Sequence, residues 1–83
     1  MTVQVSLFAR ARDLSGVATL AVELPEGGTV GELRTALLRR CPDLHDLLPR
    51  CAIAVNEEFA ADSIRVPEFA ALALIPPVSG GAC

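Results

Sequence analysis

The chain has 83 residues, of which 52% are hydrophobic and 20% charged, with a formal net charge of -3. A chain of this length forms one domain that buries about 60% of the surface its unfolded form exposes, and its apolar content excludes a disordered protein. The acidic balance disfavours nucleic acid as a partner, no apolar run reaches the ~20 residues that cross a membrane, and the N-terminus lacks a secretory signal, so we expect a cytoplasmic protein.

Two alternating segments near the N-terminus predict a pair of antiparallel strands. Apolar residues occupy every second position from Val3 to Leu7, and the same period recurs over residues 19–24. This pattern is typical of strands with one buried face. By this parity Phe8 points with the polar set, away from the core. Residues 9–16 are expected to form a loop that ends at a glycine.

A capping motif and a helical stripe predict one amphipathic helix. Thr29 and Glu32 have the spacing of a capping box, in which each side chain satisfies a free backbone N–H of the other residue. Apolar residues then recur at three- and four-residue intervals from Val30 to Cys41. Pro42 should end this helix.

The second half of the chain predicts short strands separated by turns. Asp43 is a plausible cap for a short helical turn, residues 51–55 form a strand of small residues, and Asn56-Glu57 begins a tight turn. A further short strand is expected next, before a final strand over residues 71–75. This order predicts an α+β fold, which we expect to be a β-grasp with the helix packed across one face of a mixed sheet.

The C-terminal segment is the most informative stretch for function. Pro76 and Pro77 cannot donate to a sheet and favour an extended backbone, so residues 76–83 should project as a tail from a domain formed by residues 1–75. Gly80 and Gly81 have no Cβ, which lets the backbone enter a narrow channel and bring a main-chain carboxyl group to a buried reaction centre. The tail itself is then the substrate. An ordinary frayed terminus is the alternative.

The rest of the chain offers no convincing catalytic constellation. Cys41, Cys51 and Cys83 lack the spacing of a zinc or iron–sulfur site, and His45 has no partner at ligand spacing. The serines have no evident histidine partner. We therefore expect no metal site and no tightly bound cofactor, and we interpret the protein as a carrier whose partners supply the catalysis.

These motifs resemble the small subunit of molybdopterin synthase, a ubiquitin-like sulfur carrier. The similarity runs from about Val3 to Gly81. It is carried by Pro76–Gly81 after a short apolar strand, Phe8–Arg12 after the first strand, Leu24–Val30 and Ala54–Asn56. The resemblance implies that the first and last strands lie parallel at the centre of the sheet. Glu57 stands where the family usually has glycine, which leaves the turn type open.

The resemblance also implies a mechanism. A ubiquitin-activating-type adenylyltransferase, using ATP and magnesium, adenylates the Gly81 carboxylate, and sulfur then replaces AMP. The Gly81 thiocarboxylate enters the large subunit of molybdopterin synthase, in a heterotetramer, and supplies sulfur to cyclic pyranopterin monophosphate. Gly80 and Gly81 give access, while Pro76 and Pro77 aim the tail.

Docking on a partner requires an apolar patch as well as a tail. By strand parity Phe8 and Ile75 point away from the main core, and Phe59 lies in a nearby turn. The alternative is that these three side chains cover a minor core. The partner-binding residues that we expect are Phe8, Phe59, Ile75, Pro76, Pro77, Val78 and Ser79.

Two residues follow the diglycine, Ala82 and Cys83. Active members of the family that the chain resembles end at the second glycine, so we expect a processing protease to remove Ala82-Cys83. Other functions stay open. They are a sulfur carrier for thiamine or cysteine synthesis, a ubiquitin-like modifier, and a noncatalytic β-grasp interaction module with an inert tail.

Overall fold

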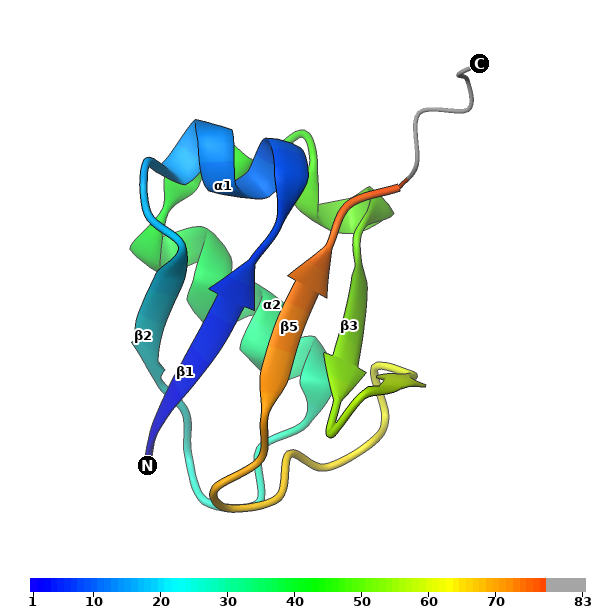
Figure 1. Cartoon of the computed structure of the whole chain (residues 1–83). Helices are drawn as coiled ribbons and strands as arrows, with labels where there is room; N and C mark the ends of the chain where they lie inside the picture. The colour runs from blue at the N-terminus through cyan, green and yellow to red at the C-terminus, as the bar shows by residue number, and fades with distance from the viewer. Residues whose placement is uncertain (78–83) are drawn as a thin grey trace.

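The computed structural model describes residues 1–77 and shows a five-stranded sheet with strand order β2-β1-β5-β3-β4 (Figure 1). The strands are β1 (Thr2–Leu7), β2 (Thr19–Glu23), β3 (Ala52–Val55), β4 (Glu58–Ala60) and β5 (Leu72–Ile75). The helices are α1 (Ala9–Ser15), α2 (Val30–Arg40) and the short 3₁₀ turns η1 (Pro42–Leu44) and η2 (Leu48–Arg50). Strands β1 and β5 are parallel at the centre, and the other neighbours are antiparallel. The α+β, β-grasp prediction is confirmed.

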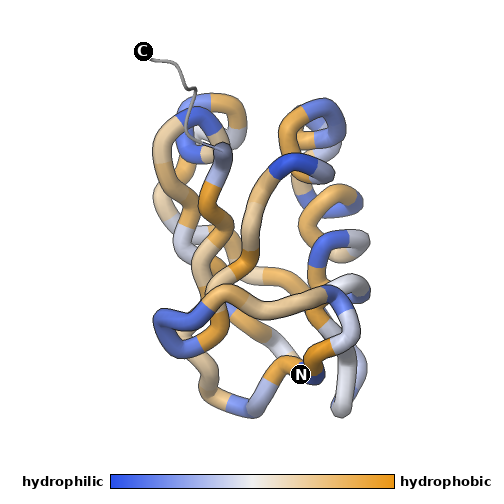
Figure 2. The backbone as a smooth tube through the Cα atoms, turned by 90° about the vertical axis from the view of Figure 1, so that its right-hand side faces the viewer, coloured by the Kyte–Doolittle hydropathy of each residue, from blue (hydrophilic) through white to orange (hydrophobic). Residues whose placement is uncertain are grey.

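The hydrophobic core lies between the sheet and α2, which form two layers in the side view of Figure 2. In β1 the predicted alternation is present, because Val3, Val5 and Leu7 are buried while the residues between them are not. Helix α2 contributes Leu33 and Leu37, whose side chains are fully buried. None of the helices within residues 1–77 has the length and apolar character to cross a membrane.

The capping box at the start of α2 is present as predicted. The backbone N–H of Glu32 donates to Thr29 Oγ1 at 3.2 Å, and the backbone N–H of Thr29 donates to Glu32 Oε1 at 3.0 Å. The helix ends at Arg40, two residues before Pro42, the predicted stop. Arg34, in the middle of α2, links the helix to two later segments of the chain. Its Nε lies 2.8 Å from Asp62 Oδ1, and its Nη1 donates to the Leu48 carbonyl at 2.9 Å.

The loop predicted over residues 9–16 is wrong, because most of this segment is helix α1. Its buried Ala11 anchors the helix on the body, and Gly16, with φ of 78°, ends it by donating its N–H to the Arg12 carbonyl at 2.9 Å. The expected cap at Asp43 is also wrong: η1 begins after Cys41, and no side chain caps it. Both segments are too short to show a helical period.

The turn between β3 and β4 has two consecutive residues in the left-handed region. Asn56 has φ of 52° and Glu57 has φ of 72°, and the pairing of Val55 with Glu58 makes this a two-residue hairpin turn. Positive φ at both central positions is the signature of a type I′ turn. Asn56 is further held by Ala71, whose N–H donates to Asn56 Oδ1 at 2.9 Å and whose carbonyl accepts from the Asn56 N–H at 2.8 Å.

We expect Glu57→Gly to raise the free energy of unfolding by about 0.5 to 1 kcal/mol. Glycine removes the steric cost of a left-handed residue, about 1 to 2 kcal/mol, but adds freedom to the unfolded chain. Urea denaturation measures the difference. The matched control is Glu58→Gly, which places the same substitution in β4 and should destabilise the protein; equal losses in both variants would contradict a strained turn.

Candidate functional site

The chain leaves the sheet through its central strand β5. Ile75 is the last residue of β5 and pairs with Ala52 of β3. Pro76 is still buried, whereas Pro77 is exposed. In Figure 1 this exit lies at the end of the sheet where α1 also lies. The chain is therefore packed against the rest of the domain as far as Pro76.

Charged side chains of both signs surround the exit. A hollow of about 700 Å³ at Pro77 is bordered by α1 and by the connection from η1 to η2. Arg10 and Arg50 contribute positive charge, and Asp43 and Asp46 contribute negative charge. Hydrogen-bonding groups of both charges thus border the exit.

Four of the predicted site residues, Val78, Ser79, Gly80 and Gly81, lie outside the described residues. Their roles in partner binding and sulfur attachment stay predictions. The same holds for the proposed boundary between a domain of residues 1–75 and a tail of residues 76–83, and for the removal of Ala82 and Cys83.

The three predicted docking residues of the body border one shallow depression of about 300 Å³ on the face of the sheet opposite α2. We call the residues Phe8, Ala54, Phe59, Ala73 and Ile75 the open-face patch. The Phe59 side chain is 75% exposed and that of Phe8 is 49% exposed. Aromatic side chains with this exposure do not enclose a second core. Within residues 1–77, these side chains therefore do not cover a minor core.

Strand register explains why these residues meet. Ala54 in β3 pairs with Phe59 in β4 on one side and with Ala73 in β5 on the other. Because Ala54 and Ala73 have small side chains, the surface between the two phenylalanines is depressed. Phe8 comes from the chain directly after β1, which is the other neighbour of β5.

The alanines of the open-face patch were missed by the sequence analysis. A signal was present, since Ala71 and Ala73 share the strand parity of Ile75. Exposed apolar side chains that form one contiguous patch mark interaction surfaces, whereas scattered ones need no explanation. The role of the patch in partner binding stays a prediction.

The buried cysteine does not provide a nucleophile. Cys51 lies in the core, and its Sγ donates to the Leu47 carbonyl at 3.3 Å. Burial raises the pKa of the Cys51 thiol above its ordinary value, and the positive charge of Arg34 opposes this only in part. The thiol therefore stays protonated at neutral pH. Nor do three or more metal-ligating side chains gather anywhere in the described part of the chain.

Comparison with known families gives one match that spans almost the whole chain. The ThiS family model matches residues 5–81. This match begins in β1 and ends on the second glycine of the diglycine pair.

Individual proteins show the same similarity. A molybdopterin synthase sulfur carrier subunit from Arabidopsis thaliana is 40% identical over 79 residues, which is 95% of this chain and 82% of that protein. The crystal structure of SAMP1 from Haloferax volcanii has a TM-score of 0.86 at 30% identity, covering 98% of this chain and 100% of that one.

A third similarity is to a structure of a complex. A protein–protein complex of subunits 1 and 2 of molybdopterin-converting factor from Helicobacter pylori contains a chain that matches with a TM-score of 0.68 at 26% identity. The match covers 98% of this chain and 100% of that chain.

Proposed function

This chain belongs to the ThiS family, and from that membership we propose that it is the sulfur carrier subunit of a molybdopterin synthase. The proposal is supported by the Arabidopsis thaliana relative, which is named as such a subunit and is 40% identical. The same similarity supports the coarser role of a sulfur carrier. The family match reaches Gly81, the residue that would carry the sulfur.

One structural observation supports the proposal: the chain leaves the sheet beside the open-face patch. Ile75 is part of the open-face patch and is followed directly by Pro76 and Pro77. A partner that covers the patch is therefore positioned to receive the residues that follow. Because prolines favour an extended backbone, the chain should enter the partner without folding back.

The chemistry takes place on the Gly81 carboxylate. A carboxylate oxygen attacks the α-phosphorus of ATP on an activating partner, pyrophosphate leaves, and an acyl-adenylate forms with the help of magnesium. A sulfide-level sulfur nucleophile then attacks the acyl carbon, and AMP leaves with the electron pair of the C–O bond. The resulting thiocarboxylate delivers sulfur to cyclic pyranopterin monophosphate. Within this chain Gly80 contributes access, since its lack of Cβ admits a narrow channel.

The partner that receives the loaded tail is the large subunit of the synthase. The Helicobacter pylori complex of subunits 1 and 2 of molybdopterin-converting factor supports a partner of this kind. We propose a heterotetramer of two carriers and two large subunits, in which the open-face patch meets the large subunit. The activating partner is an adenylyltransferase of the ubiquitin-activating type.

Processing precedes activation in this scheme. Ala82 and Cys83 follow Gly81, so the Gly81 carboxyl group is tied up in a peptide bond until a protease cuts after it. A cysteine side chain would also not fit a channel shaped for glycine. Only the trimmed chain should therefore accept sulfur.

Intact mass spectrometry tests the proposal. The full chain and a form that ends at Gly81 are each incubated with a candidate activating enzyme, ATP, magnesium and a sulfur donor. We expect the shorter form alone to gain the mass that replaces one oxygen by sulfur, and to lose this gain when ATP is left out. Equal sulfur gain by the full chain would contradict the processing step, and no gain by either form would contradict the carrier role.

A second candidate is a small protein modifier, which the similarity to SAMP1, a small archaeal modifier protein, favours. A modifier would be activated in the same way, but its C-terminal carboxyl group would then form an amide bond with an amine of another protein. Supplying the loaded chain with the large subunit and cyclic pyranopterin monophosphate separates the two, because a carrier is recovered with its carboxylate restored.

A further inference from the structure

The outer edge of the sheet at β2 is open. In an antiparallel pair, residues whose backbone groups face the neighbouring strand alternate with residues whose groups face away. Leu24 N–H donates to the Met1 carbonyl and Leu7 N–H donates to the Ala18 carbonyl, both at 2.8 Å. The even-numbered residues of β2 therefore face β1. The N–H and C=O groups that face outward belong to Thr19, Ala21 and Glu23.

These outward groups have no backbone partner in residues 1–77, since β2 is the first strand in the sheet order and pairs with β1 alone. An open strand edge is a template on which another extended segment can pair. The edge is also easy to approach, because the Ala21 side chain is small and exposed.

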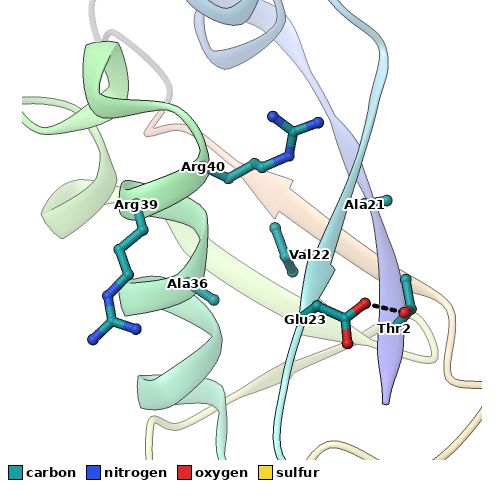
Figure 3. A pocket seen from close by; sticks show the side chains of 7 residues that line it. All are labelled: Thr2, Ala21, Val22, Glu23, Ala36, Arg39 and Arg40. Atoms are coloured by element: carbon teal, nitrogen blue, oxygen red, sulfur yellow. Dashed lines mark hydrogen bonds between the residues drawn. The ribbon is translucent and has the colours of Figure 1, made fainter.

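A groove runs between this edge and helix α2 (Figure 3). Its volume is about 470 Å³. Val22 of β2 and Ala36 of α2 give it an apolar floor, and Arg39 and Arg40 from the last turn of α2 border it. Figure 3 shows Arg40 extending from the helix toward β2.

The two arginines give the groove a charge opposite to that of the whole chain, whose net charge is -3. Neither Arg39 nor Arg40 has a carboxylate within 4.0 Å among residues 1–77, where the ion pairs are those of Arg34 with Asp62 and of His45 with Asp46. The one acidic residue in the groove, Glu23, accepts a hydrogen bond from Thr2 Oγ1. The positive end of the groove is thus available to carboxylates of a partner.

We propose that the outer edge of β2 is a docking site for an extended acidic segment of another protein. The segment adds to the sheet as a further strand beside β2 and exchanges hydrogen bonds with Thr19, Ala21 and Glu23. Its apolar side chains, at alternate positions, enter the groove. Its carboxylates pair with Arg39 and Arg40.

Charge favours this occupant over a second copy of the chain. A copy pairing through its own β2 would bring a single carboxylate, Glu23, and each copy carries a net charge of -3. A short acidic segment supplies several carboxylates to the arginines and does not bring a second copy of the acidic domain close to the first. The site is also separate from the open-face patch, because β1 lies between β2 and β5 in the sheet. A partner bound here can hold the protein while its tail is engaged elsewhere.

An NMR titration of the full chain tests the proposal. The probe is an amidated peptide with the sequence Val-Thr-Val-Thr-Val followed by three aspartates, and its control has three lysines in place of the aspartates. We expect saturable binding of the aspartate peptide with hydrogen-exchange protection gained at the amides of Thr19, Ala21 and Glu23. Binding of the lysine peptide should be about tenfold weaker.

Two variants locate the site. Ala21→Pro removes an outward N–H without touching the ladder to β1, as edge strands permit, and should weaken binding about tenfold. Arg39→Gln with Arg40→Gln should weaken it about fivefold. The matched control for charge is Arg12→Gln with Arg65→Gln, two exposed arginines that do not line the groove, and it should leave the affinity unchanged.

Several outcomes overturn the proposal. They are equal affinity for both peptides, the same loss of affinity in the charge control, and absence of saturable binding. Protection of the same amides that grows with protein concentration and without peptide assigns the edge to a second copy instead, which also overturns it.

Discussion

Replacing Phe8 by serine is expected to weaken binding of the large subunit about thirtyfold while the fold stays intact. A half-exposed aromatic at the centre of an interface typically contributes about 2 kcal/mol or more when truncated, and 1.4 kcal/mol is a factor of ten in affinity. Phe8 is 49% exposed and borders the open-face patch. Its backbone is extended at the N-cap of α1, where serine is a preferred residue, so the substitution should not destabilise the protein.

Phe69→Ser is the matched control for this prediction. Phe69 is 96% exposed and does not line the patch, so the same substitution there removes an exposed aromatic and leaves the open-face patch intact. Isothermal titration of the large subunit with each variant, ended at Gly81, gives the two affinities. Equal losses in the two variants, or an unchanged affinity for Phe8→Ser, would remove the patch from the interface.

Leu37→Ala is expected to lower the free energy of unfolding by about 3 to 4 kcal/mol. The Leu37 side chain is fully buried where α2 packs on the sheet. Truncation of a buried leucine loses its transfer free energy and leaves a cavity that a small core closes poorly. Domains of this size have only about 4 to 12 kcal/mol of stability in total. Urea denaturation followed by circular dichroism measures the loss.

The neighbouring Leu38→Ala provides the comparison. Leu38 is in the same helix but is 36% exposed, so helix propensity changes equally in both variants and only burial differs. We expect a loss below about 1 kcal/mol for Leu38→Ala. Losses of similar size at both positions would mean that α2 does not pack through the stripe that includes Leu37.

Where side chains and backbone act locally, the sequence was sufficient to predict structure. The capping box of Thr29 and Glu32 involves residues three apart, so its geometry depends on little else. The alternation in β1 likewise follows from one buried face. Helix α1 was missed because its one buried residue, Ala11, is small and leaves no apolar stripe.

Prediction of the candidate site from the sequence was incomplete for a different reason. Phe8 and Ile75 were placed by strand parity, which needs only the period of a strand. Ala54 and Ala73 were missed because their adjacency depends on the register between β3 and β5. A sequence does not encode that register at any one position. The free edge of β2 likewise follows from strand order, and no local pattern reveals it.

The position of β5 has a consequence for the order of folding. The hairpins β1–β2 and β3–β4 are joined in the sheet only through β5, and its pairing of Leu72 with Val5 joins residues from opposite ends of the domain. Contacts between residues so far apart in the sequence cost loop-closure entropy before any stabilising interaction forms, and this slows folding. Insertion of β5 is thus expected to be the late, cooperative step. Because β5 both completes the sheet and leads into the C-terminal residues, a chain that has not finished folding does not yet place those residues for any partner.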